Sequence, residues 1–126
     1  MRRKTNDRGA AAVEFALVIP VLLLLVLGTI EFSRLYNEQI SLANAARSAA
    51  RVMAISNDQG LAVAAALQAA PALNPALTGG DIAFAPAACA AGLNMTVSID
   101  YEASLLTGWF GATLPLHGEA ATPCGG

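Results

Sequence analysis

The side chains that could do chemistry are few in this chain, and most of them stand alone. His117 is the only histidine, and it lies between Leu116 and Gly118, where a surface role is more common than a catalytic one. Asp100 and Glu102 alternate along an expected strand, which makes them solvated acids rather than an acid–base pair. The sequence contains no phosphate-binding glycine loop, metal-binding helix or nucleophile elbow. We therefore expect a protein that is not an enzyme and that uses no cofactor, metal or small-molecule substrate.

Glu14 is the acidic residue whose position most needs an explanation, because it is the only charged side chain between Ala10 and Ile30. An unpaired carboxylate in hydrocarbon costs on the order of 2–3 kcal/mol. One interpretation is that Glu14 lies among the lipid headgroups and only marks the start of a membrane span. The other is that Glu14 finds a cationic partner when subunits meet, which would fix the register between them rather than stabilise either one.

The apolar run that Glu14 opens, over residues 10–30, predicts a transmembrane helix. At about 1.5 Å per residue the run spans roughly 30 Å, the thickness of a bilayer core. The leader before it, residues 1–9, carries one acidic side chain and four basic ones, Arg2, Arg3, Lys4 and Arg8. This positive excess keeps the N-terminus in the cytoplasm and sends the rest of the chain across the membrane. Pro20 within the run is either a tolerated kink or a soft point in the helix.

Residues 31–55 are expected to continue the helix beyond the membrane, because their apolar side chains follow a 3–4 spacing. The apolar face holds Phe32, Leu35, Gln39, Leu42, Ala46, Ala49 and Met53, and the polar face holds Arg34, Asn37, Ser41, Asn44, Ser48 and Arg51. Glu31 is within reach of Arg34, and Arg34 of Glu38. The small side chains of Ala45, Ala46, Ala49 and Ala50 let another element approach closely. This chain's own sheet and the helix of a neighbouring subunit both fit that stripe.

The remaining residues, 56–126, predict one small domain of mixed structure. The expected elements are a helix break at 56–60, a short helix at 61–70, a loop at 71–80, and strands at 81–86, 94–102 and 112–121. Trp109, Phe110, Leu114 and Leu116 are expected to supply further core contacts. The predicted fold class is therefore α+β, with a long N-terminal helix and a small antiparallel sheet that packs against it.

Cys89 and Cys124 both follow the span, in a compartment that we infer to be oxidising. Two cysteines in that setting most simply form one disulfide, which closes a loop of about 36 residues. The pair lacks the CxxC spacing and the nearby histidines of a zinc site. No Lys or Arg follows Arg51, so the domain has no basic patch that suits nucleic acid.

A basic leader that ends in a glycine, with an acid and an aromatic residue shortly after it, forms a recognisable arrangement. The residues concerned are Arg8, Gly9, Ala10, Glu14 and Phe15. The arrangement resembles the processing site of type IV pilin-like proteins, in which a prepilin peptidase cuts after the glycine and the glutamate becomes the fifth residue of the mature chain. The Glu–Phe pair, the proline in the span and the Glu-Phe-Ser-Arg run at 31–34 resemble, more narrowly, the TadE-like family. These are pseudopilins or minor pilins of tight-adherence (Flp-type) pilus systems, and the resemblance covers residues 8–54.

The resemblance implies a prepilin-like structural subunit that is cut after Gly9 and is required to assemble a Flp-type pilus. Cutting would leave a free amine on Ala10, and the Glu14 carboxylate of the same chain or of a neighbour would neutralise it. The implied partners are a prepilin peptidase, other Tad pilins or minor pilins, and an inner-membrane assembly platform. The implied location is the bacterial inner membrane, with residues 56–126 in the periplasm. The alternative is an unprocessed single-span signal anchor whose periplasmic domain binds a partner protein.

Overall fold

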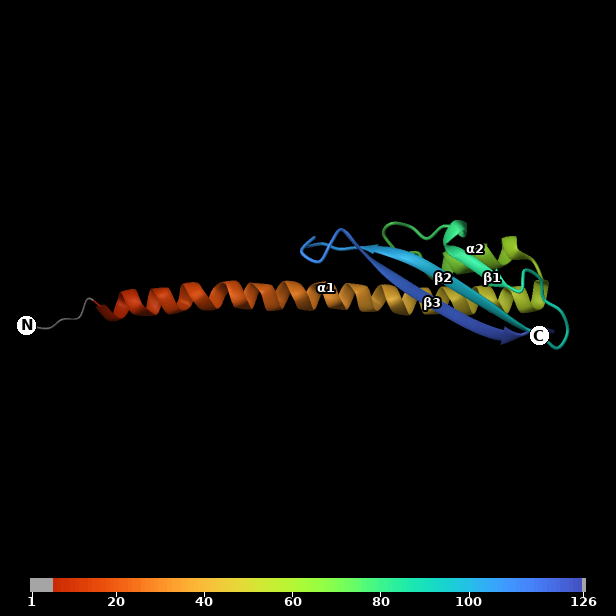
Figure 1. Ribbon diagram of the computed structural model, residues 1–126, viewed down its shortest axis with the longest axis horizontal. Coiled ribbons are helices and arrows are strands. Elements are labelled where there is room, and N and C mark those ends of the chain that lie inside the picture. The colour runs from red at the N-terminus through yellow and green to blue at the C-terminus, as the bar shows by residue number, and fades with distance from the viewer. Residues whose placement is uncertain (1–5, 126) are drawn as a thin grey trace, which may run out of the picture.

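A computed structural model describes residues 6–125 of the chain, as a long helical rod with a small domain around its outer half (Figure 1). The rod is helix α1, Asn6–Ser56, which is continuous over 51 residues and passes through Pro20. Arg2, Arg3 and Lys4 of the basic leader lie outside the described residues. The N-terminal half of α1 projects alone, whereas its C-terminal half packs against the domain (Figure 1).

The domain, which we call the head (residues 57–125), begins where α1 ends. Helix α2, Gln59–Ala69, starts at Asp58, whose carboxylate accepts a hydrogen bond of 3.0 Å from the Leu61 N–H and so caps the helix. A short 3₁₀ helix, η1 (Gly79–Asp81), leads into the strands β1 (Ile82–Ala85), β2 (Asn94–Ser104) and β3 (Thr113–Pro123).

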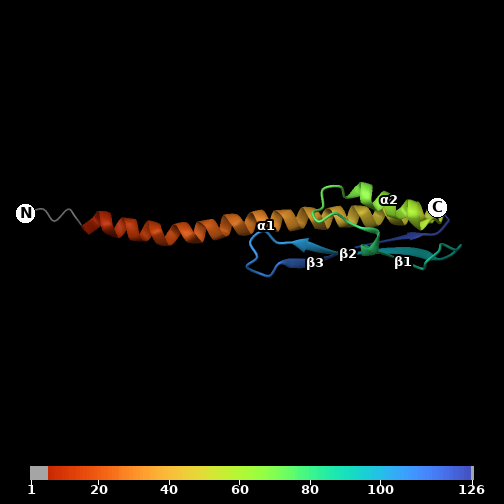
Figure 2. The ribbon, with the colours of Figure 1, turned by 90° about the horizontal axis from the view of Figure 1, so that it is seen from above.

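The three strands form one antiparallel sheet in the order β1-β2-β3. Viewed from above, α2 and the sheet lie along different sides of α1 (Figure 2). A long helix, a short helix and an antiparallel sheet confirm the predicted α+β class. The helix break, the short helix and the three strands all occur within a few residues of their expected positions.

The core is the interface between α1 and the elements that cover it. The strict alternation along β2 buries one face of the strand against α1, as its sequence pattern predicted. The largest fully buried side chains are Leu42 and Met53 of α1 and Met95, Val97 and Ile99 of β2. The four small residues of the stripe, Ala45, Ala46, Ala49 and Ala50, are fully buried too. This chain's own α2 and sheet cover them, and the stripe has no exposed surface left for the helix of a neighbouring subunit.

Three aromatic side chains that the sequence suggested for the core are exposed instead. The exposed fraction is 71% for Phe32, 68% for Trp109 and 88% for Phe110. Phe32 stacks on Tyr36 at the surface of α1, with ring centroids 6.3 Å apart, while Trp109 and Phe110 belong to the turn after β2. Phe32 follows the 3–4 spacing, and all three side chains are apolar. Neither property distinguishes a protein core from another apolar environment. Of the other two expected contacts, Leu116 is half-buried against the core and Leu114 is exposed.

Gly118 sets how closely β3 approaches α1. A Cβ added at Gly118 would lie 2.9 Å from both the carbonyl carbon and the carbonyl oxygen of Leu42. Those atoms are backbone, so they cannot move aside by a change of rotamer. Glycine is therefore required here for the close contact between strand and helix.

Replacing Gly118 by alanine should lower the free energy of unfolding of the head by about 1–3 kcal/mol, because the strand must move away from the helix. Thermal or urea unfolding of the full chain in detergent micelles, followed by circular dichroism, measures the loss. Gly80→Ala is the matched control, since its Cβ would meet nothing closer than 3.7 Å. Equal stability of the two variants would contradict the close contact.

Candidate processing and assembly site

The residues predicted for processing and assembly all lie in the first turns of α1. Arg8, Gly9, Ala10, Glu14 and Phe15 are helical and exposed. Ala10 and Glu14 are four residues apart, so they share one face of the helix. Within residues 6–125, Glu14 takes part in none of the ion pairs. Any partner for its charge must therefore come from outside the described chain or from a newly formed N-terminus.

The start of α1 differs from the expected start of the rod at Ala10. The chain is already helical from Asn6, the first described residue, so the predicted cleavage point after Gly9 lies inside a helix. Asp7 in the first turn favours this extension, because its negative charge complements the positive end of the helix macrodipole. Gly9 does not break the helix, and a Cβ there would meet nothing within 4 Å.

The segment after the predicted cleavage point has the length and character of a membrane span. Among the described residues, α1 is the one helix long and apolar enough to cross a membrane. Every side chain from Ala10 to Ile30 is exposed in the single chain, so this surface would face water without a bilayer or a partner. A continuous apolar surface of that size is characteristic of contact with lipid or protein.

A polar cluster joins the rod to the head just beyond the apolar run. Glu31 is buried, and its two carboxylate oxygens accept hydrogen bonds of 2.9 and 3.1 Å from the Leu106 N–H. The spacing in the sequence suggested Arg34 as the partner of Glu31. In the structure Glu31 instead binds the turn after β2. Arg34 instead donates to the Glu38 carboxylate at 3.0 Å, as predicted, and to the Ser104 carbonyl at 3.2 Å.

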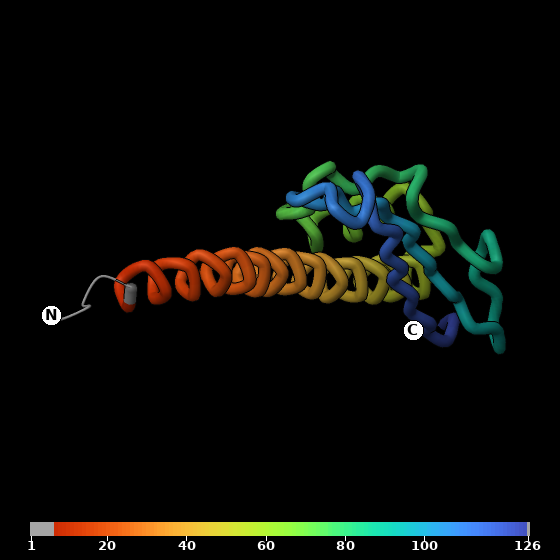
Figure 3. The backbone as a smooth tube through the Cα atoms, turned by 60° about the vertical axis from the view of Figure 1, so that its left-hand side comes forward, coloured from red at the N-terminus to blue at the C-terminus, as the bar shows by residue number. Residues whose placement is uncertain are grey.

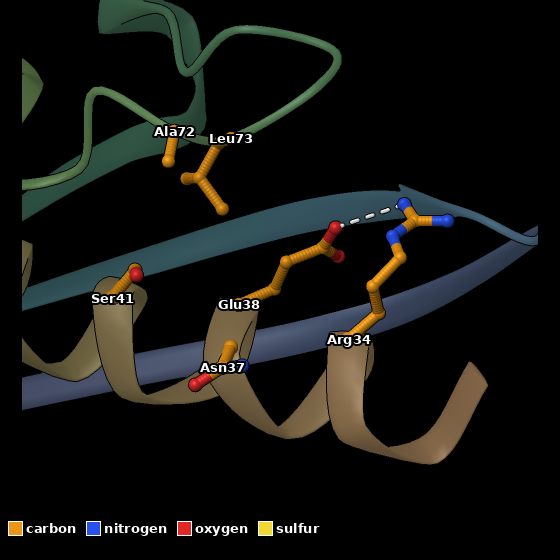
Figure 4. Close-up of a pocket in the computed structure, with 6 residues that line it drawn as sticks. All are labelled: Arg34, Asn37, Glu38, Ser41, Ala72 and Leu73. Carbon is orange, nitrogen blue, oxygen red and sulfur yellow. Dashed lines mark hydrogen bonds and ion pairs between the residues drawn. The ribbon is translucent and has the colours of Figure 1, made fainter. Parts of the chain in front are cut away.

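Glu38 is buried to the same extent as Glu31. Figure 4 shows its side chain pointing from α1 toward Arg34, beneath Ala72 and Leu73 of the loop after α2. These residues line a small cavity of about 160 Å³. The second carboxylate oxygen, Oε2, is buried with no hydrogen-bond partner among the described residues. Burial, followed by the negative charge of Glu38, raises the pKa of Tyr101, whose hydroxyl donates to the Pro75 carbonyl at 2.7 Å.

Comparison with known proteins assigns the segment that carries these residues. Residues 9–51 match the family model of TadE-like protein. This segment is TadE-like. No curated protein matches the chain significantly, and no solved structure does.

The TadE-like segment begins at Gly9 and ends within α1, so it includes the two residues predicted for assembly, the apolar run and the α1 side chains of the polar cluster. It confirms the family resemblance seen in the sequence. The family points to a protein associated with the components of the Tad pilus and with the membrane. The strands and α2 lie outside the match, so the head is described by its structure alone.

Arg34→Met should lower the free energy of unfolding of the protein by about 2 kcal/mol, because Glu38 stays buried without a counter-charge. The loss should fall below that of a deeply buried pair, since the Arg34 side chain is 30% exposed. The double variant Arg34→Met/Glu38→Leu should recover most of it, because an apolar pair leaves no buried charge. Urea unfolding of the full chain in micelles compares the three proteins. A double variant no more stable than the single one would refute this account of the cluster.

A disulfide and the hydrogen bonds around it hold the end of the head that lies farthest from the apolar run. The predicted disulfide between Cys89 and Cys124 is present, with Cα atoms 5.5 Å apart. Asn57, in the turn between α1 and α2, accepts a hydrogen bond of 2.6 Å from the Cys89 N–H. The Cys124 N–H donates to the Leu93 carbonyl at 2.8 Å. The C-terminus, the loop before β2 and the end of α1 are thus held together at one point.

Sequence reasoning missed the role of Asn57, although a signal was available. Asn57 has a φ of 51°, in the left-handed region. Asparagine adopts that conformation more readily than most residues. The Glu31–Leu106 bond had no comparable signal, because its partners lie 75 positions apart.

His117 lies on the exposed face of the sheet. It stands alone in the sequence, but in the structure two acidic side chains lie beside it. Its Nδ1 is 2.7 Å from Asp100, which sits opposite it in the β2–β3 register, and its Nε2 is 3.5 Å from Glu119. Glu102, the other acid expected to be free, accepts a hydrogen bond from the Thr113 hydroxyl. Among residues 6–125 no group of acids, histidines and cysteines has the arrangement of a metal site.

The hydrogen bond to Asp100, followed by that to Glu119, raises the pKa of His117 above its ordinary value. Folding therefore favours the protonated imidazole. The stabilisation is fully present below about pH 6.5, the ordinary pKa of histidine, and is lost as the pH rises through the raised value. An NMR titration of the imidazole should show the Asp100→Asn variant titrating at a lower pH than the wild type. Identical titration curves would contradict the pairing.

Proposed function

We propose that the protein is a prepilin-like structural subunit, a pseudopilin or minor pilin, that a prepilin peptidase cuts after Gly9 and that is required to assemble a Flp-type pilus. The TadE-like match over residues 9–51 carries this proposal. It begins at the glycine of the expected cleavage point and includes Glu14, the expected assembly residue.

The geometry of α1 supports the proposal in two ways. Ala10 and Glu14 lie on one exposed face of the helix, so a new amine on Ala10 and the carboxylate of Glu14 can pair within a chain or between neighbours. The apolar run beyond them is exposed on all sides in the single chain, which suits a helix that rests in a bilayer and passes into contact with other helices. In this proposal the head lies in the periplasm and α1 crosses the inner membrane.

The alternative function, a permanent single-span anchor whose head binds a partner protein, is favoured by one observation. The chain is helical on both sides of Gly9, and a peptidase must locally unwind a helix before it can cut the backbone. In this alternative the leader stays attached, and Glu14 lies among the headgroups.

The intact mass of the protein extracted from host membranes, with and without the prepilin peptidase, distinguishes the two functions. A chain that begins at Ala10 only when the peptidase is present supports the subunit. A chain that begins at Met1 in both samples supports the anchor. Gly9→Leu is the matched control, because the structure leaves open space at Gly9, so the variant should fold and insert normally yet keep its first residue.

A further inference from the structure

The turn between β2 and β3, residues 105–112, reaches back from the head along α1 toward its projecting half (Figure 3). Between the turn and α1 lies an apolar groove of about 680 Å³. One wall is formed by Leu24, Leu27 and Gly28 of the apolar run, and the other by Trp109, Phe110 and Leu114. The turn therefore lies beside the outer end of the segment that is long enough to cross a membrane.

We propose that this turn inserts into the membrane surface on the side of the head, with Trp109 and Phe110 at the boundary between lipid headgroups and acyl chains. The occupant of the groove is then phospholipid. The head is held against the bilayer at a second point besides α1.

The depth of the groove supports lipid as its occupant. Leu24 lies six positions before Ile30, the end of the apolar run, which is about 9 Å along a helix axis. Elements that lie in a membrane interface bury their apolar faces by roughly 5–10 Å. A turn that faces Leu24 cannot stay in water while α1 crosses the bilayer with its apolar run in hydrocarbon.

The side chains of the turn match that environment. Residues 105–112 contain no charged side chain, and Leu106, Trp109 and Phe110 are each more than 60% exposed. Tryptophan is enriched at membrane interfaces, because its ring is apolar while its N–H keeps a polar partner. In water the same three side chains would form an exposed apolar patch with no compensation.

Part of the backbone of the turn is hydrogen-bonded within the chain. The Leu105 N–H donates to the Ala112 carbonyl at 3.0 Å, and the Gly111 N–H donates to the Gly108 carbonyl at 3.4 Å. The Leu106 N–H is bound by the buried Glu31 carboxylate. Polar backbone groups near hydrocarbon need such internal partners.

The inference rests on α1 as a membrane span, and not on cleavage after Gly9 or on pilus assembly. Trp109 is the only tryptophan of the chain, so its fluorescence reports the turn directly. The full chain is reconstituted in phosphatidylethanolamine–phosphatidylglycerol vesicles, and quenching by bromine on the lipid acyl chains is compared with quenching by iodide in the water. We expect brominated lipid to reduce the emission at least twofold, and iodide to quench it several-fold less than in the control below.

The control moves the reporter to the far end of the head, as Trp109→Phe/Leu93→Trp. Leu93 is exposed and lies next to the disulfide, so this variant should be quenched by iodide and not by brominated lipid. Equal iodide access in the two proteins would overturn the inference. Protection of Trp109 that rises with the protein-to-lipid ratio would also overturn it, by identifying a second copy of the chain in the groove. Flotation of the vesicles distinguishes failure of the inserted turn from failure of the membrane span. A chain that floats with the vesicles but leaves Trp109 in water refutes only the inserted turn. A chain that fails to float refutes the span as well.

Discussion

Replacing Glu14 by alanine should leave the protein in the membrane and abolish pilus assembly. Insertion depends on the apolar run, and removing a carboxylate only makes that run more apolar. In the proposed function, assembly depends on the pairing of Glu14 with a cationic amine, and in the described chain the charge of Glu14 has no ion-pair partner of its own. The variant is expressed in a host that lacks its own copy. Membrane fractions then report insertion, and pili sheared from the cells report assembly.

The expected loss of pili is at least tenfold, and Val13→Ala is the matched control because Val13 is also exposed and lies one position away. Glu14→Gln separates charge from shape, since it keeps the size of the side chain and should fail like the alanine variant. Normal piliation in either Glu14 variant would refute the pairing. Loss of the protein from the membrane would instead show that Glu14 acts during insertion.

Removing the disulfide should be the most destabilising change in the head. In the chain-entropy model, opening a loop with a sequence separation of 35 costs about 4 kcal/mol, because the unfolded chain regains its freedom. The double variant Cys89→Ser/Cys124→Ser avoids leaving an unpaired thiol. Thermal unfolding of the full chain in micelles, followed by circular dichroism, should give a clearly lower midpoint than that of the wild type.

The wild-type protein treated with a reductant is the internal control, and its midpoint should fall to that of the double variant. If the reductant lowers the unfolding midpoint of the wild type but not that of the variant, the loss of stability is due to the disulfide itself. An unchanged midpoint in the variant would show that the hydrogen bonds of Asn57 and Cys124 hold the far end of the head without the disulfide.

The parts of this fold that sequence predicts are those set by local periodicity. The alternation in β2 defined both a strand and its buried face, because neighbouring side chains of a strand point to opposite sides. The long apolar run and its 3–4 continuation defined α1 for the corresponding reason in helices. The disulfide followed from arithmetic, since the chain has two cysteines and both lie beyond the span.

The parts that sequence did not predict depend on contacts between distant segments. The need for glycine at position 118 becomes visible only when β3 is placed across Leu42. Phe32, Trp109 and Phe110 were assigned to the core because periodicity measures apolar character and not the identity of the apolar medium. The partner of Glu31 could not be chosen in advance, because Arg34 satisfies the local rule and Leu106 is reached only through the tertiary fold.

Pro20 gives the rod a mechanical property. Proline has no N–H, so the bond to the Ala16 carbonyl is missing from an otherwise continuous helix. A load applied along or across α1 is carried by every turn in series, and bending concentrates at the turn with the missing bond. Glu14 and the head lie on opposite sides of that turn. The head can therefore change its tilt under tension while the contact proposed for Glu14 stays in register.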